Sequence, residues 1–141
     1  MIIKVKKLKD DAVIPKYAYD GDAAMDLYSA EEFVLKSGER KLISTGIAME
    51  IPRNHVGLIW DKSGLAAKNG IHIMAGVVDS NYRGEIKVVV KNLGDDDFKI
   101  EKNSKIAQMI VQPFLSVKIE EVKELSKSNR GDGGFGHTGL K

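Results

Sequence analysis

The sequence predicts an all-β domain, a jelly-roll-like distorted barrel of many short strands with one short helix and a flexible glycine-rich C-terminal arm. Short runs rich in Val and Ile recur along most of the chain, and clusters of Gly, Asn, Asp and Ser separate them. Many short strands at near-regular spacing are typical of this class. With 141 residues the chain has room for one core. We expect the domain at residues 1–125 and the arm at residues 126–141.

The predicted strands begin near the N-terminus and continue through most of the chain. In order they are Ile3–Val5, Phe33–Leu35, Lys41–Ile43, Ile47–Ile51, Val56–Trp60, Ile71–Met74, Glu85–Asn92, Phe98–Ile100, Lys105–Gln112 and Val117–Val122. A turn at Ser37-Gly38 separates the second and third runs, and Pro52 ends the fourth. Only Gly64–Lys68 has the pattern of one or two helical turns.

The C-terminal arm has a different composition. Between Arg130 and Gly139 half of the residues are glycine, so the segment cannot bury enough apolar area to offset the entropy of ordering it. It nevertheless carries Arg130 and Phe135 in that glycine background. Glycines let a backbone approach a phosphate closely, an arginine pairs with the phosphate, and a phenyl ring stacks on a flat ring. These features predict a lid that folds over a ligand.

Charge and cysteine content exclude several classes of function. Lys plus Arg number 22 against 20 for Asp plus Glu, a net charge of +2, which gives no general case for nucleic-acid or membrane binding. The chain has no cysteine, so disulfides and thiolate metal sites are excluded. No apolar stretch approaches the roughly 20 residues of a membrane span, and the alternating start is unlike a signal peptide. We expect a soluble cytoplasmic protein.

The segment Gly76–Gly84 is the strongest candidate for chemistry. Two valines lead into Asp79, a polar turn carries Tyr82, and a β-branched strand follows. This pattern predicts a hairpin that holds both side chains rigidly near its mouth. A carboxylate fixed at a strand end is well placed to act as a base. The alternative is that Asp79 only caps the turn while Tyr82 packs on a neighbouring strand.

Three further pieces each have a functional and a structural interpretation. Lys62, Ser63 and Gly64 end a strand just before the predicted helix, which suits an anion site or simple N-capping by Ser63. For Asp26, the functional interpretation is a position near a metal ion, and the structural one is a surface turn. Gln108 faces away from its apolar neighbours, where it binds water or phosphate or is merely solvated. The three histidines have no metal-ligand spacing.

Taken in order, five pieces of this chain resemble the motifs of the homotrimeric dUTP pyrophosphatases (dUTPases). Those motifs are similar to Ala-x-Asp-Leu, Pro-Arg-Ser-Gly-Leu-Ala, Gly-x-Ile-Asp-x-x-Tyr-x-Gly, Gly-Asp-Arg-Ile-Ala-Gln and Arg-Gly-x-x-Gly-Phe-Gly-Ser-Thr-Gly. They correspond here to Ala24–Leu27, Asp61–Ala66, Gly76–Gly84, Asn103–Gln108 and Arg130–Gly139.

The chain departs from these motifs at several places. Lys62 and Lys105 replace arginines, which keeps the charge and loses the bidentate fork. Asn103-Ser104 replaces Gly-Asp, and His137 replaces serine. The departures affect individual phosphate contacts rather than the type of reaction.

The resemblance implies hydrolysis of dUTP to dUMP and pyrophosphate with Mg²⁺. Asp79 would deprotonate a water for in-line attack on the α-phosphorus, with Gln108 holding that water or the α-phosphate. Lys62, Ser63 and the Gly64 amide would stabilise charge on the leaving pyrophosphate. The three phosphates would hold Mg²⁺, and Asp26 would contact the ion through water.

The resemblance also implies how the substrate is selected. Main-chain groups of Gly76, Val77, Val78 and Asp79 would bind the uracil edge, and Tyr82 under the sugar would exclude a 2′-hydroxyl. The remaining expected substrate-binding residues are Lys87, Arg130, Phe135, Gly136 and Thr138. The arm would close over a neighbouring subunit, so that each of three sites in a homotrimer is built from three chains.

Three alternatives have to be weighed. A dCTP deaminase of the same fold carries a glutamate where this chain has Val88–Val90, and it lacks this type of arm. A non-catalytic nucleotide-binding relative would have lost Asp79 or the arm, and both are present. A purely structural jelly roll accounts for the strands but not for the five motifs.

Overall fold

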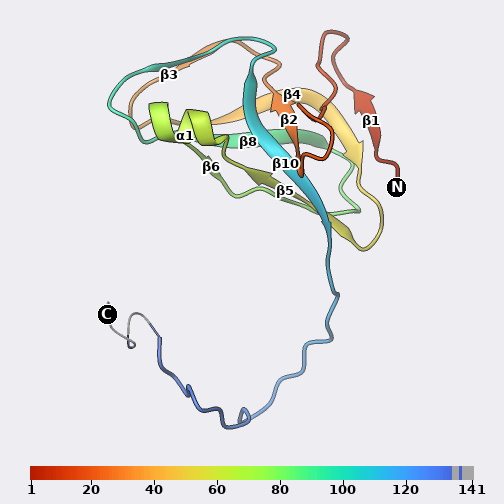
Figure 1. Cartoon of the computed structure of the whole chain (residues 1–141). Helices are drawn as coiled ribbons and strands as arrows, with labels where there is room; N and C mark the ends of the chain where they lie inside the picture. Colours follow the sequence, from red (N-terminus) through yellow and green to blue (C-terminus); the bar gives the residue numbers. More distant parts are fainter. Residues whose placement is uncertain (135–136, 138–141) are drawn as a thin grey trace.

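The structure is a computed structural model that describes residues 1–134 and 137. These residues form three antiparallel sheets and one short helix (Figure 1). One four-stranded sheet has the order β1 (Lys4–Lys7), β4 (Arg40–Glu50), β8 (Glu85–Asn92) and β6 (Ile71–Met74). The other has the order β2 (Ala24–Tyr28), β10 (Lys105–Pro113), β5 (His55–Trp60) and β7 (Val77–Val78). The third sheet pairs β3 (Phe33–Leu35) with β9 (Phe98–Ile100), and helix α1 spans Ser63–Asn69.

The core forms where the inner faces of these sheets meet. In β8, buried Ile86, Val88 and Val90 alternate with more exposed neighbours, as expected for a strand with one face inward. The cluster draws on all three sheets; its fully buried members include Leu27, Leu35, Ile43, Val90, Ile100 and Met109. We therefore describe the fold as jelly-roll-like, with apolar side chains of facing sheets packed together.

The predicted fold class is confirmed in its strands and its single helix, and corrected in its closure. Over residues 1–134 the strands form separate sheets rather than a closed barrel. The bounds predicted for β3, β6, β8 and β9 agree with the structure. The predicted pair of strands at Lys41–Ile43 and Ile47–Ile51 is one strand, β4, interrupted by a bulge between Ser44 and Ala48, where Gly46 has φ +69°.

The hairpin predicted around Gly76–Val90 is wrong in its pairing. Strand β7 pairs with β5, whereas β8 pairs with β4 and β6 in the other sheet. Positive φ angles at Ala75 (+63°) and Gly76 (+121°) redirect the chain after β6 from one sheet to the other. The turn at Asp79–Tyr82 then returns it to β8, so this segment connects the two sheets.

Two further corrections concern the ends of the domain. Ala24–Tyr28 forms strand β2, which sequence periodicity missed, and Asp26 is therefore not a surface turn residue. The strand predicted at Val117–Val122 is absent: after β10 the described chain extends away from the sheets without a pairing partner (Figure 1). Within residues 1–134, no helix has the length and apolar character needed to cross a membrane.

Candidate active site

A cavity of about 360 Å³ opens beside the connection between the sheets. Its lining includes Gly76, Val77, Val78, Asp79, Tyr82 and Lys87. Gly76 is required at this place because an added Cβ would lie 2.7 Å from the carbonyl oxygen of Ile59. The close approach of the backbone to β5, together with a φ of +121°, leaves no other residue type unstrained there.

Tyr82 is held by its own turn. Its backbone N–H donates to the Asp79 carbonyl oxygen at 3.1 Å, and its hydroxyl donates to the Glu85 carbonyl oxygen at 3.0 Å. The ring lies so close to Gly84 that a Cβ there would be 2.3 Å from the hydroxyl oxygen. Tyr82 thus folds over its own turn instead of packing on a neighbouring strand, while 45% of the residue stays exposed at the cavity.

Asp79 contributes to the turn through its backbone and not through its side chain. The residue is exposed, and its carboxylate takes part in none of the hydrogen bonds found among the described residues. The turn-capping alternative therefore does not account for a carboxylate at this position. What the fold provides is an ionisable oxygen pair at the rim of the cavity, on a backbone fixed by the Tyr82 N–H.

Glu85 anchors the start of β8 beside this turn. Its carboxylate accepts hydrogen bonds from Ser44 and from the Gly46 N–H, the latter at 2.9 Å, and so fills the bulge of β4. Burial alone would raise the pKa of Glu85, but the bonds from Ser44 and Gly46 and the charge of Lys87 lower it overall. Lys87 lies 3.6 Å from the same carboxylate. The ionised Glu85 side chain therefore fixes the position of the Glu85 carbonyl oxygen, which accepts the hydrogen bond from the Tyr82 hydroxyl.

Asp26 is the centre of a second group of charged residues. It is only 4% exposed, and its two carboxylate oxygens pair separately with the ammonium groups of Lys62 and Lys105, the latter at 2.6 Å. Burial alone would raise the pKa of Asp26, but hydrogen bonds from Lys105 and Lys62 outweigh it and lower the pKa. The same contact raises the pKa of Lys105. The carboxylate is thus kept ionised.

The sheet that contains β2 places Gln108 next to this carboxylate. Gln108 is the direct partner of Asp26 on one side and of Trp60 on the other, so the three side chains project from the same face. The Gln108 amide donates to the Asp61 carbonyl oxygen at 2.8 Å. It lines a groove of about 490 Å³ together with Trp60, His72 and Gly76. Gln108 is therefore held in place rather than solvated.

Ser63 is the first residue of α1 and not its cap. The cap position belongs to Lys62, and the helix has no side-chain cap hydrogen bond, so the N-capping alternative is wrong. A Cβ added at Gly64 would meet no atom within 4 Å, which leaves the backbone there open to a ligand. Ser63 and Gly64 follow Lys62 directly, next to the Asp26 cluster.

The predicted site residues other than those of the arm lie in or beside two adjoining hollows. Gly76–Asp79, Tyr82 and Lys87 share one cavity, and Gln108 lines the adjoining groove. Asp26 and Lys62–Gly64 line neither. Arg130 lies in the arm, where its Nε–H donates to the Gly133 carbonyl oxygen at 2.7 Å. Phe135, Gly136 and Thr138 lie outside the described residues.

Sequence reasoning gave no role to Asp61 or Glu85, although both anchor the site. Each is a carboxylate at the junction of a β-branched strand and a turn, and that position was the available signal. Lys105 was noted only as a replacement for arginine. In the part of the chain that the structure describes, no cluster of three or more His, Asp or Glu side chains suits a metal ion.

Comparisons with known proteins identify the family of this chain. The dUTPase family model matches residues 10–139. A deoxyuridine 5'-triphosphate nucleotidohydrolase of Clostridioides difficile is 55% identical over 140 residues, which cover 98% of this chain and 98% of that protein. Its counterpart in Clostridium acetobutylicum is 52% identical over 141 residues, covering 99% and 97%.

Solved structures give the same result. The dUTPase of Staphylococcus bacteriophage 80alpha with dUpNHpp superposes with a TM-score of 0.92 at 30% identity, covering 99% of both chains. A mutant dUTPase of phage phi11 of S. aureus, reported for the coordination of a structural Mg(II) ion, has a TM-score of 0.83 at 25% identity and covers 90% of this chain and 100% of that one. The chain belongs to the dUTPase family.

Proposed function

We propose that this chain hydrolyses dUTP to dUMP and pyrophosphate with Asp79 as the general base. The observation that carries the proposal is the exposed Asp79 carboxylate on a fixed turn beside Tyr82, at the rim of a cavity of about 360 Å³. A cavity of this size suits a nucleoside. The relatives' names specify deoxyuridine triphosphate as the substrate, and the cavity offers main-chain groups for a base edge.

Asp79 starts the reaction by taking a proton from a water molecule. That water attacks the α-phosphorus in line with the bridging oxygen, the bond between the α-phosphorus and this oxygen breaks, and pyrophosphate leaves with the electron pair. Gln108 is suited to hold the water or an α-phosphate oxygen, because its amide is already oriented by the Asp61 carbonyl group. Asp79 acts as the base, and Gln108 positions the water or the α-phosphate.

Lys62, Ser63 and the Gly64 amide act on the leaving group. They offer an ammonium group, a hydroxyl and an open backbone amide within three consecutive residues, which suits the charge that develops on pyrophosphate. Lys62 also contacts Asp26, so its ammonium group is placed by a buried carboxylate. As a lysine it provides charge without the bidentate geometry of the family's arginine.

Asp26 is the residue that fits Mg²⁺. A hard cation prefers carboxylate oxygens, and the lowered pKa of Asp26 keeps its carboxylate ionised. Both oxygens already contact lysines, which favours contact with the ion through water over direct ligation. The bound ion would neutralise charge on the substrate phosphates.

Selection of the substrate is assigned to the cavity. Backbone groups of Gly76–Asp79 would hydrogen-bond uracil, and an unmet bond in a buried site costs about 1–3 kcal/mol, which disfavours cytosine. The Tyr82 ring would lie under the sugar and leave no space for a 2′-hydroxyl. Lys87, tied to Glu85, would contribute positive charge at the same wall.

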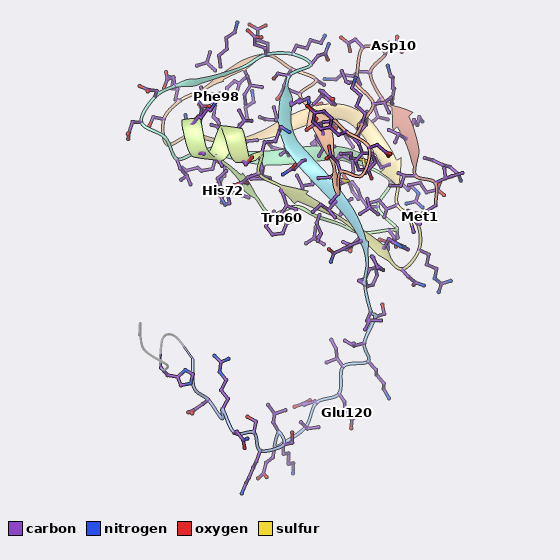
Figure 2. All side chains as sticks on the ribbon, in the orientation of Figure 1. Met1, Asp10, Trp60, His72, Phe98 and Glu120 are labelled. Carbon is purple, nitrogen blue, oxygen red and sulfur yellow. The ribbon has the colours of Figure 1, made fainter. Side chains whose placement is uncertain are left out.

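We assign the site to a homotrimer in which neighbouring subunits complete it. Within one chain, Asp26 lies beside Gln108 at the groove, and Lys62 follows the groove residue Asp61. The segment that leads to the arm extends away from the sheets, with Glu120 far from them (Figure 2). We propose that residues 126–141 form an arm that closes over a neighbouring subunit, with Arg130 and Thr138 on phosphates, and Phe135 and Gly136 over the base.

We place the enzyme in the cytoplasm; the lack of cysteine supports this.

The test is Mg²⁺-dependent release of pyrophosphate from dUTP, measured beside dCTP, dTTP and UTP. We expect turnover that is confined to dUTP and that is lost when the metal is chelated. Release of ammonia from dCTP would contradict the proposal and identify a deaminase. Tight binding without turnover of any of the four nucleotides would instead identify a non-catalytic relative.

A further inference from the structure

We propose that Asp61 and His72 form a positioning pair that holds Gln108 and the start of α1 in the geometry needed for turnover. The inference rests on the proposed function, because it assigns these residues a role in the same hydrolysis. The dUTPase motif has proline at the position of Asp61. Because a proline side chain accepts no hydrogen bond, the pair is a feature of this chain that the motif does not explain.

The Asp61 carboxylate joins the two large sheets. The residue follows β5 directly, whereas both partners of its side chain lie on β6 in the other sheet. One carboxylate oxygen accepts the backbone N–H of Ile73 at 2.6 Å. The other lies 2.8 Å from Nδ1 of His72. Two short bonds to one strand fix both the position and the rotation of the carboxylate.

The backbone of Asp61 transmits this position to the catalytic groups. Its carbonyl oxygen accepts the Gln108 amide at 2.8 Å, and its next two residues are Lys62 and Ser63. A displacement of Asp61 therefore moves the acceptor that orients Gln108 and also moves the residues assigned to the leaving group. Since catalysis depends on alignment within fractions of an ångström, such a displacement lowers kcat more than it changes substrate binding.

His72 is the adjustable half of the pair. It lies at the groove that Gln108 and Trp60 also line, and Figure 2 shows it on the same side of the domain as Trp60. Lys91 is its direct partner on β8, and Arg40 is on the far side of Lys91 in the same row. Both neighbours are cationic, so Asp61 is the acceptor within reach. His72 itself is exposed, and substitutions there leave the core intact.

The experiment compares His72→Asn with His72→Gln. The asparagine amide nitrogen occupies about the place of Nδ1, whereas the glutamine amide nitrogen lies nearer the place of Nε2. We expect His72→Gln to lower kcat about three- to tenfold with KM within about twofold, and His72→Asn to retain most of the wild-type kcat. His55→Gln is the matched control, because His55 begins β5 away from Gln108 and the only hydrogen bond found for its Nδ1 among the described residues is to the nearby Arg53 carbonyl oxygen.

A double-mutant cycle tests whether the pair acts through Gln108. Asp61→Ala should lower kcat about tenfold or more in the wild type and by a smaller factor in a Gln108→Ala background, where only the route through Lys62 and Ser63 remains. Additive losses, equal kcat for His72→Asn and His72→Gln, or a change confined to KM would overturn the proposal. All comparisons are made relative to wild-type turnover of dUTP, so a wild-type enzyme without that activity would instead refute the proposed function.

Discussion

Asp79 is the residue to which we assign the role of general base. Its backbone is fixed by the Tyr82 N–H, and its carboxylate is exposed at the cavity. We expect Asp79→Asn to bind a non-hydrolysable dUTP analogue about as well as the wild type, while kcat falls by about 10²–10⁴-fold, since an amide cannot accept the proton. Calorimetric binding and single-turnover kinetics would measure both. Wild-type kcat in Asp79→Asn would assign the base elsewhere.

Gly84 controls where Tyr82 lies. A methyl group at this position would come within 2.3 Å of the tyrosine hydroxyl, so Gly84→Ala must displace the ring. We expect the ratio of kcat/KM for dUTP over UTP to fall about tenfold, because the ring no longer blocks the space for a 2′-hydroxyl. Ser80→Ala in the same turn is the control and should retain the ratio. An unchanged ratio in Gly84→Ala would remove Tyr82 from sugar selection.

The placement of single residues was predictable where the chain itself carried the signal. Asp79 and Tyr82 were expected to lie together because one short turn holds both. The burial of Asp26 was not predictable, because it depends on contacts with Lys62 and Lys105, which come from two other parts of the chain. The charge anchor at Glu85 was missed for the same reason: its partners lie on β4, about 40 residues earlier in the sequence.

At the scale of elements, local pattern determined which segments are strands but not which strands pair. The alternation of apolar and polar residues in the sequence predicted the bounds of β6, β8 and β9. The partner of β7 depends on the bend at Ala75-Gly76, which sends the chain to β5 instead of back along β8. β2 was missed because its five residues lie between stretches rich in glycine and polar residues.

The contact of Asp26 with Lys62 and Lys105 ties β2 to β10 and to the start of α1, and it predicts a pH dependence. The pKa of Asp26 is lowered in the folded protein, so its contribution to stability is present above its unfolded pKa of about 3.9 and is lost as the pH falls through the folded pKa. The pKa of Lys105 is raised, so that contribution is present below about pH 10.4 and is lost as the pH rises through the folded pKa.

Asp26→Asn tests this dependence. The wild type should be more stable than the variant across neutral pH, and the difference should shrink in strong acid and in strong base. Denaturant unfolding at a series of pH values measures the difference. Asp95→Asn, a change in an exposed turn, is the control. A difference that stays constant down to strong acid would show that the charge of Asp26 is not what stabilises the contact.

At the scale of the whole molecule, we expect the domain to fold without the arm. The hydrogen bonds formed by residues Leu115–Gly134 all join residues of the arm, and the core cluster contains none of the residues in this range. We expect removal of Ser128–Lys141 to leave a folded trimer with little activity. Sedimentation and thermal unfolding would check the assembly, and pyrophosphate release would check the loss. Full activity of the truncated protein would contradict the lid assignment.

The most direct test of the shared site mixes two inactive variants, the truncated chain that ends at residue 127 and full-length Asp79→Asn. Both are denatured and refolded together in equal amounts. If the arm serves a neighbouring pocket, a site is active when its Asp79 comes from the truncated chain and its arm from the full-length chain. Each choice has a chance of one half, so about one quarter of wild-type activity should return. If each arm served its own pocket, no mixed site would be complete, and the mixture would remain as inactive as its components.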